Sequence, residues 1–164
     1  MDNLLPTIRN AARALIIQEN RILLLRKEGG GRGVRFALPG GAQDTGETLH
    51  QALIRECLEE INVAPAVHSL VHVADFFKQR DSQPPTIRHL VEFLFLCSVP
   101  DTYSPQSGSH PDKHQVDVVW IEINQLAQLP LFPRAFKPYL QSLGQGDTPV
   151  YLGGMNDDDI SQEH

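Results

Sequence analysis

Four glutamates are concentrated in one short stretch of the sequence, GGAQDTGETLHQALIRECLEEINV, at residues 40–63. Glu56, Glu59 and Glu60 fall within five positions, and Glu47 lies upstream, behind a Gly-Gly turn. Carboxylates this close repel one another, but together with a free backbone carbonyl they form an oxygen-rich site for a hard divalent cation. The Cys and His spacing of a zinc site is absent, so Mg2+ or Mn2+ fits this ligand set better than zinc.

These glutamates are expected to lie on a helix over residues 49–61, because the segment contains no Gly or Pro. Thr48 and Gln51 have the spacing of a capping box, and Asn62 suits the left-handed residue that closes a helix. The apolar residues of the segment share about half of the helix circumference: Leu49, Leu53, Ile54, Cys57, Leu58 and Ile61. The glutamates share an arc of about 100° on the other side. A solvated acidic face is one explanation, but the Gly-Gly turn, where backbone can approach a ligand, favours a binding site.

The spacing of these residues closely resembles the Nudix box, the signature of the Nudix hydrolases. That signature reads G, five residues, E, seven residues, R-E-U-x-E-E-x-G-U, where U is a bulky aliphatic residue. Here it runs from Gly41 to Val63 and covers a small part of the 164 residues. Cys57 stands at an aliphatic position and Asn62 at the glycine, whereas all five charged positions are kept.

The resemblance implies hydrolysis of the pyrophosphate bond in a nucleoside diphosphate linked to another moiety. Nucleotide sugars, ADP-ribose and nucleoside triphosphates all remain open as substrates, with Mg2+ (or Mn2+) as the cofactor. The implied metal ligands are the Gly40 carbonyl, Glu56, Glu59 and Glu60. Glu56 or Glu59 would also activate the water, while Arg55 and Glu47 would pair and brace the loop against the helix. The alternative is a Nudix domain that senses a nucleotide without cleaving it.

Further candidates lie outside the box, and each has a plain structural alternative. Arg26 and Arg35 flank a glycine-rich segment and are predicted to contact phosphates, and Phe76 is predicted to stack on a base. Some family members use a further acid on the loop before a strand that carries a Trp. At that place the resemblance leaves Asp112 and His114 as candidates, and Glu92 is a candidate on a strand.

The rest of the chain predicts one α/β domain, which the resemblance makes a Nudix-type α/β/α sandwich with a mixed central sheet. The domain is expected over residues 1–143, with residues 1–9 as a loose or edge segment. The expected strands cover residues 11–17, 21–26, 35–38, 67–78, 87–99 and 115–123, with a short helix around 133–143. Residues 144–164, rich in Gly and Asp, are predicted to be a polar tail that is partly disordered.

Composition narrows the partners. The net charge is −6 and the sequence shows no run of Lys and Arg, which argues against binding of nucleic-acid polymers. An acidic protein would need metal cations between itself and a small anionic nucleotide. No signal peptide and no apolar run of ~20 residues are present, which argues against a membrane protein. Cys57 and Cys97 lie in apolar runs, which favours a reducing, cytoplasmic setting. Family members are often dimers, so a homodimer is one expectation, although no residues mark an interface.

Overall fold

The computed structural model describes residues 3–80, 82–143 and 147–156. These residues form a mixed sheet in the order β8-β3-β2-β1-β6-β5-β9, with β4 paired to β1 and β7 paired to β2. The strands are β1 Leu4–Gln18, β2 Arg21–Lys27, β3 Arg35–Ala37, β4 Gly40–Ala42, β5 Ala66–Arg80, β6 Thr86–Ser98, β7 Gln115–Glu122, β8 Leu131–Phe132 and β9 Tyr151–Asn156. Strands β1 and β6 run parallel, whereas β5 and β6 form a long antiparallel pair.

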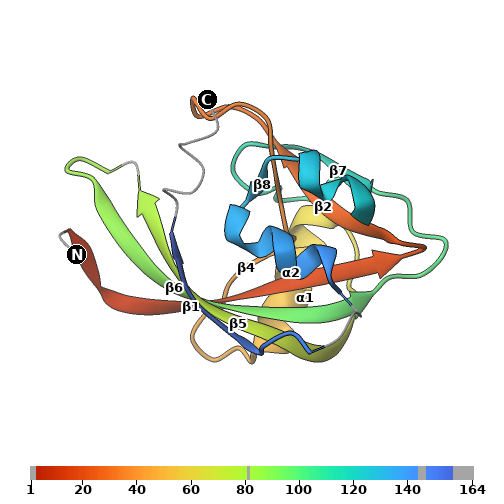
Figure 1. Ribbon diagram of the computed structural model, residues 1–164, viewed down its shortest axis with the longest axis horizontal. Helices are drawn as coiled ribbons and strands as arrows, with labels where there is room; N and C mark the ends of the chain where they lie inside the picture. Colours follow the sequence, from red (N-terminus) through yellow and green to blue (C-terminus); the bar gives the residue numbers. More distant parts are fainter. Residues whose placement is uncertain (1–2, 81, 144–146, 157–164) are drawn as a thin grey trace.

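Helices cover both faces of the strongly curled sheet (Figure 1). The helices are α1 Leu49–Ile61 and α2 Lys137–Gln141, with 3-10 turns at Ile123–Gln128 and Arg134–Phe136. Successive strand residues alternate between two cores. One core joins α1 to alternate residues of β1 and β2, such as Ile16 and Leu23, and the other joins α2 to Leu15 and Leu24. The expected α/β fold with a mixed central sheet is therefore confirmed.

Helix α1 has the bounds that the sequence predicts. Thr48 and Gln51 exchange both hydrogen bonds of a capping box, and Asn62 closes the helix in the left-handed region with φ 60°. The wheel is wrong at two positions, because Leu58 is 46% exposed whereas Glu60 is only 2% exposed. No helix in the described part of the chain has the length and apolar character needed to cross a bilayer.

Two segments are more ordered than the sequence suggests. Strand β1 begins at Leu4, because residues 4–16 pair in parallel with β6. Within the expected tail, β9 pairs in parallel with β5, and Met155 is buried. Residues 144–146 and 157–164 of that tail lie outside the described residues.

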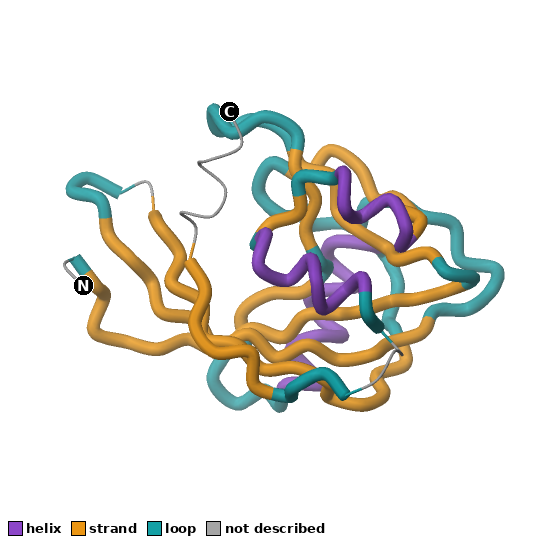
Figure 2. Tube along the Cα trace, viewed as in Figure 1, coloured by secondary structure: helices purple, strands orange, loops and turns teal. Residues whose placement is uncertain are grey.

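Strands β1, β5 and β6 continue beyond the layers of the sandwich. Their ends extend together to the left in Figures 1 and 2, away from α1 and α2. We call this extension the arm and define it as residues 4–9, 77–80 and 86–89. The three strands stay paired along the arm: Ile8 of β1 lies opposite His89 on one side of β6, and Lys78 of β5 lies opposite Arg88 on the other side.

Candidate active site

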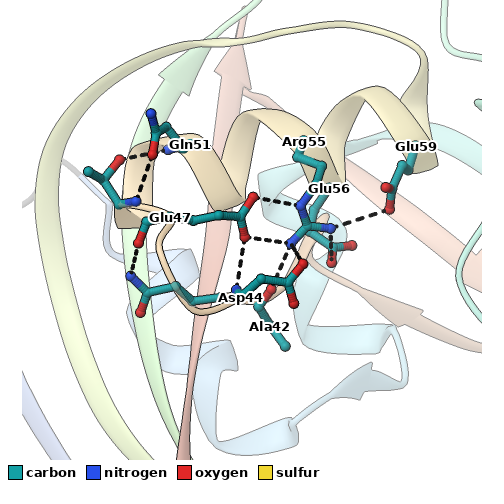
Figure 3. Close-up of polar contacts among 9 residues, drawn as sticks. Ala42, Asp44, Glu47, Gln51, Arg55, Glu56 and Glu59 are labelled. Atoms are coloured by element: carbon teal, nitrogen blue, oxygen red, sulfur yellow. Dashed lines mark hydrogen bonds and ion pairs between the residues drawn. The ribbon is translucent and has the colours of Figure 1, made fainter.

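Arg55 fastens the loop before α1 to the helix itself (Figure 3). Its guanidinium donates from Nε to Glu47 Oε2 at 2.7 Å and from Nη2 to Glu47 Oε1 at 2.9 Å. The same Nη2 donates to the Ala42 carbonyl at 2.9 Å, and the Asp44 N–H donates to Glu47 at 2.8 Å. The hydrogen bonds from Arg55 and Asp44 lower the pKa of Glu47 to about 2. The pairing of Arg55 with Glu47 that the resemblance implies is thus present.

Glu56 and Glu59 both lie beside Arg55. The guanidinium Nη1 donates to Glu56 Oε1 at 3.0 Å and lies 3.6 Å from Glu59 Oε2. The Glu56 carboxyl also lies against Gly41, where an added Cβ would come within 2.5 Å of Glu56 Cδ. Burial raises the pKa of Glu56 above its usual range, while the Glu59 side chain keeps 36% of its surface exposed. Gly41 therefore provides the room that the Glu56 carboxylate occupies.

Glu60 faces inward and contacts the glycine turn rather than solvent. The Gly40 N–H donates to Glu60 Oε1 at 2.8 Å, and burial raises the pKa of Glu60 to about 8. Gly40 has φ +130°, and a Cβ at this position would collide with the Ala12 carbonyl oxygen. The turn between β3 and β4 therefore lies directly over the last turn of α1. This contact is the physical reason why Glu60 does not share a solvated arc with its neighbours.

Arg13 lies beside this turn and was not among the residues predicted from the sequence. Arg13 donates from Nη1 to the Gly40 carbonyl at 3.0 Å, and from Nε and Nη2 to Glu92 at 2.9 and 3.3 Å. Glu92 is 1% exposed, so its candidate role becomes that of the ion-pair partner which positions Arg13. A sequence signal existed, because each residue is a lone charge inside an apolar strand, and opposite charges in such strands compensate each other when they pair.

The donor set suits a hard divalent cation. Glu56, Glu59 and Glu60 supply only carboxylate oxygens, which Mg2+ and Mn2+ prefer. Burial raises the pKa of Glu56 and Glu60, which means that it disfavours their ionised forms, and a bound cation would offset this cost. Among the residues that the structure describes, no three acidic, His or Cys side chains already converge on one point. The oxygen donors of these residues are thus of the type that such a cation binds, although their side chains do not yet surround one point.

Two adjoining cavities open beside these carboxylates. One, of about 320 Å³, is lined by Gly40, Gly41 and Glu56, and the other, of about 280 Å³, lies next to it. They share Lys78, Arg80 and Asp112 as lining residues. Nine of the chain's 14 Lys and Arg residues line them: Arg9, Arg13, Lys27, Arg32, Arg35, Lys78, Arg80, Arg88 and Lys113. Folding thus gathers the positive charge that is scattered along the sequence.

The fold and the glutamate-bearing helix α1 agree with the protein family whose sequence model this chain matches. A family model described as the NUDIX domain matches residues 7–142. The chain belongs to the Nudix family. The membership that the box suggested is therefore confirmed.

Several proteins resemble this Nudix chain. An ADP-ribose pyrophosphatase of Methanocaldococcus jannaschii is 34% identical over 89 residues, which are 54% of this chain and 50% of that protein. The chain thus spans about half the length of this relative. The Nudix hydrolase YvcI of Bacillus subtilis is 27% identical over 77% of this chain and 73% of its own. A crystal structure of a UDP-X diphosphatase shares the fold with TM-score 0.64 at 24% identity, covering 90% of this chain and 68% of that one.

The remaining predicted residues of this Nudix domain fall in different places. Arg26 forms an ion pair with Glu28 at 2.6 Å and does not line either cavity described above. Arg35 lines the 280 Å³ cavity but is buried, and its Nη1 donates to the carbonyls of Gly29 and Gly33. It therefore holds the glycine-rich segment in shape.

The last of the predicted site residues are Phe76 and two residues of the loop before β7. Phe76 is 1% exposed and meets the Phe132 ring edge-on, so it presents no open face for a base in this structure. Asp112 lines both cavities and accepts a hydrogen bond from Lys27 Nζ at 2.8 Å. The His114 ring lies against Gly29 and Gly30 at the edge of the 280 Å³ cavity. Asp112 is thus the acid of this loop that the structure brings to the site.

Proposed function

We propose that this Nudix protein is a divalent-metal-dependent pyrophosphohydrolase that acts on a nucleoside diphosphate linked to another moiety. The arrangement of Glu56 and Glu59 around Arg55, with Glu56 lining a cavity rich in Lys and Arg, is the observation that carries this proposal. The similarity to the ADP-ribose pyrophosphatase of M. jannaschii supports it. ADP-ribose, nucleotide sugars and nucleoside triphosphates are the substrates to test.

Glu59 is the better placed of the two glutamates to take a proton from the attacking water. It lies 3.6 Å from Arg55 Nη1, whereas Glu56 lies at 3.0 Å, and its side chain is more exposed. The water oxygen forms a bond to one phosphorus while the bridging P–O bond breaks, and the leaving phosphate keeps the electron pair. The products are two phosphorylated species, one of them a nucleoside monophosphate.

The remaining residues prepare the site for this step. Arg55 holds the Glu56 carboxylate and, through Glu47, the loop that carries the Gly-Gly turn. Glu56, Glu59 and Glu60 are the residues that would hold the cation. Bound Mg2+ or Mn2+ supplies charge neutralisation for the phosphates and lowers the pKa of the attacking water. The free, buried thiols of Cys57 and Cys97 support a cytoplasmic setting, and a homodimer stays a prediction for solution scattering to test.

The proposal is tested by product release from ADP-ribose, nucleotide sugars and nucleoside triphosphates, with Mg2+ and with EDTA. One substrate should be hydrolysed in an EDTA-sensitive way, and Glu59→Gln should lower kcat by about 10²- to 10⁴-fold. The melting temperature should hardly change, because this side chain is partly exposed. Glu122→Gln, an exposed acid on β7, is the matched control and should keep full activity.

Two results would contradict this assignment. Full activity in Glu59→Gln would remove this glutamate from the catalytic step. If the unmodified protein hydrolyses none of the substrates while nucleotides still raise its melting temperature, a nucleotide-sensing Nudix domain would be favoured instead.

A further inference from the structure

Three arginines lie together on one face of the arm. Arg88 on β6 lies directly opposite Lys78 on β5, and Arg80 follows two residues later, on the same face of β5. Arg9 on β1 lines the same 320 Å³ cavity as Arg80 and Arg88. We call Arg9, Lys78, Arg80 and Arg88 the basic wall. Like charges directly opposite each other on neighbouring strands destabilise a sheet, so this arrangement calls for an explanation.

No carboxylate among the described residues pairs with Arg9, Arg80 or Arg88. The acidic side chains that line the same cavity are Glu56 and Asp112, and each already contacts another cation, Arg55 and Lys27 respectively. Glu92, the next nearest acid on β6, is held by Arg13. Desolvation and the charges of Arg80 and Arg9 lower the pKa of Arg88 below its usual range. Arg9, Arg80 and Arg88 therefore hold positive charge that no carboxylate of the described residues compensates.

The cavity connects this charge to Glu56 of the Nudix box. Its lining includes Gly40, Gly41 and Glu56 on one side and Arg9, Arg80 and Arg88 on the arm. A single ligand in this cavity would contact both sides. Arginine forms paired hydrogen bonds with phosphate oxygens, and several arginines around one group favour a doubly charged phosphate over a single carboxylate.

We propose that Arg9, Arg80 and Arg88 form a second anion site, which binds a phosphate group of the substrate other than the pyrophosphate that is cleaved. The substrate class is therefore a nucleotide that carries an additional phosphate. This inference rests on the proposed hydrolysis at the Nudix box. The additional phosphate has two sources, a longer phosphate chain or a phosphate on a ribose hydroxyl, and both present the same chemistry.

The test compares substrates that differ by one phosphate. ADP-ribose is measured against ADP-ribose 2′-phosphate, and a nucleoside diphosphate against the matching triphosphate, which separates the two sources. Arg80→Gln, Arg88→Gln and the double variant are compared with Lys137→Gln, which removes one positive charge on α2, outside both cavities. The double variant should raise KM at least tenfold for one phosphate-bearing substrate and less than twofold for its partner, with kcat nearly unchanged. Circular dichroism should show the same fold in all variants.

A binding measurement keeps this inference separate from the proposed function. Calorimetry on the Glu59→Gln protein with the same pairs reports affinity even if no substrate is hydrolysed. Preference for the phosphate-bearing partner, lost in the triple variant that adds Arg80→Gln and Arg88→Gln, would support the second site. Equal losses for both partners, or no loss, would overturn it. Binding of a 5′-phosphorylated oligonucleotide more tightly than of its mononucleotide, through the same arginines, would also overturn it in favour of a polymer.

Discussion

The two walls of the cavity are built in opposite ways. What we call the acidic wall is Glu56, which lines the cavity, together with its neighbours Glu47, Glu59 and Glu60 on and before α1. It is held chiefly by Arg55 and by the N–H of Gly40, the residue before the box. The basic wall places Arg88 opposite Lys78 and has no described carboxylate partner for Arg9, Arg80 or Arg88. The acidic wall is therefore preorganised by the protein alone. Arg9, Arg80 and Arg88 have no such carboxylate among the described residues, so the proposed anion would supply the charge that compensates them.

The largest expected loss of stability comes from a substitution at Gly40, whose N–H holds Glu60 of the acidic wall. Gly40→Ala should lower the free energy of unfolding by about 3 kcal/mol or more. The residue has φ +130°, and its new Cβ would collide with the Ala12 carbonyl. Chemical denaturation measures this loss. Gly41→Ala is the matched comparison: the atoms nearest to its Cβ all belong to the Glu56 side chain, which can move, so activity should fall while the stability change stays small. Equal stability losses in both variants would contradict this account.

Glu60 makes the stability of the acidic wall depend on pH. Its pKa in the folded protein is about 8, above the ordinary 4.5, so folding favours the protonated form. The contribution is complete below pH 4.5 and is lost as the pH rises to 8. In EDTA, the unmodified protein should lose up to about 1.4 kcal/mol per pH unit in this window, and Glu60→Gln should lack this slope. Melting curves at pH 5 and 8 measure it; a Glu59→Gln control should keep the slope.

Arg55→Lys tests whether the brace depends on the shape of the guanidinium. A lysine cannot reproduce the two bonds to Glu47 and the bond to the Ala42 carbonyl, so stability should fall by about 1–3 kcal/mol. Activity should fall as well, because Glu56 loses its partner. A double variant with Glu47→Gln, measured by urea unfolding, should lose less than the two single losses combined. Simple additivity would show that the two residues act separately.

The smallest effect is expected in the basic wall and has the opposite sign. Arg88→Gln removes a like charge opposite Lys78, so the free energy of unfolding should rise by about 0.2–1 kcal/mol at low salt. The gain should shrink in 0.5 M NaCl, because salt screens exposed charges. Paired thermal melts at low and high salt measure it. A loss of stability would mean that Arg88 has a structural partner and that the contrast between the walls is wrong.

The acidic wall was easier to predict from the sequence than the basic wall. The glutamates of the acidic wall lie close together in the sequence, so residue types and spacing predicted the bounds of α1 and its caps, while the resemblance to the Nudix box implied the Arg55–Glu47 pair. The wheel misplaced Glu60 because it contains no information about the glycine turn that covers the helix. Arg13, Arg9 and Arg88 were missed because β1 and β6, which bring them together, are some 80 residues apart in the chain. Phe76 was assigned by residue type, whereas its strand turns the ring into the core.

Strand β9 has a practical consequence for handling the protein. The family match ends at residue 142, but β9 covers residues 151–156 and pairs with β5, with the Tyr151 hydroxyl 2.5 Å from Asp75. A chain shortened to the family boundary would leave the N–H and C=O groups along one side of β5 unpaired. Exposed strand edges recruit other strands and promote aggregation. Recombinant versions for crystallisation or assay should therefore extend past residue 156.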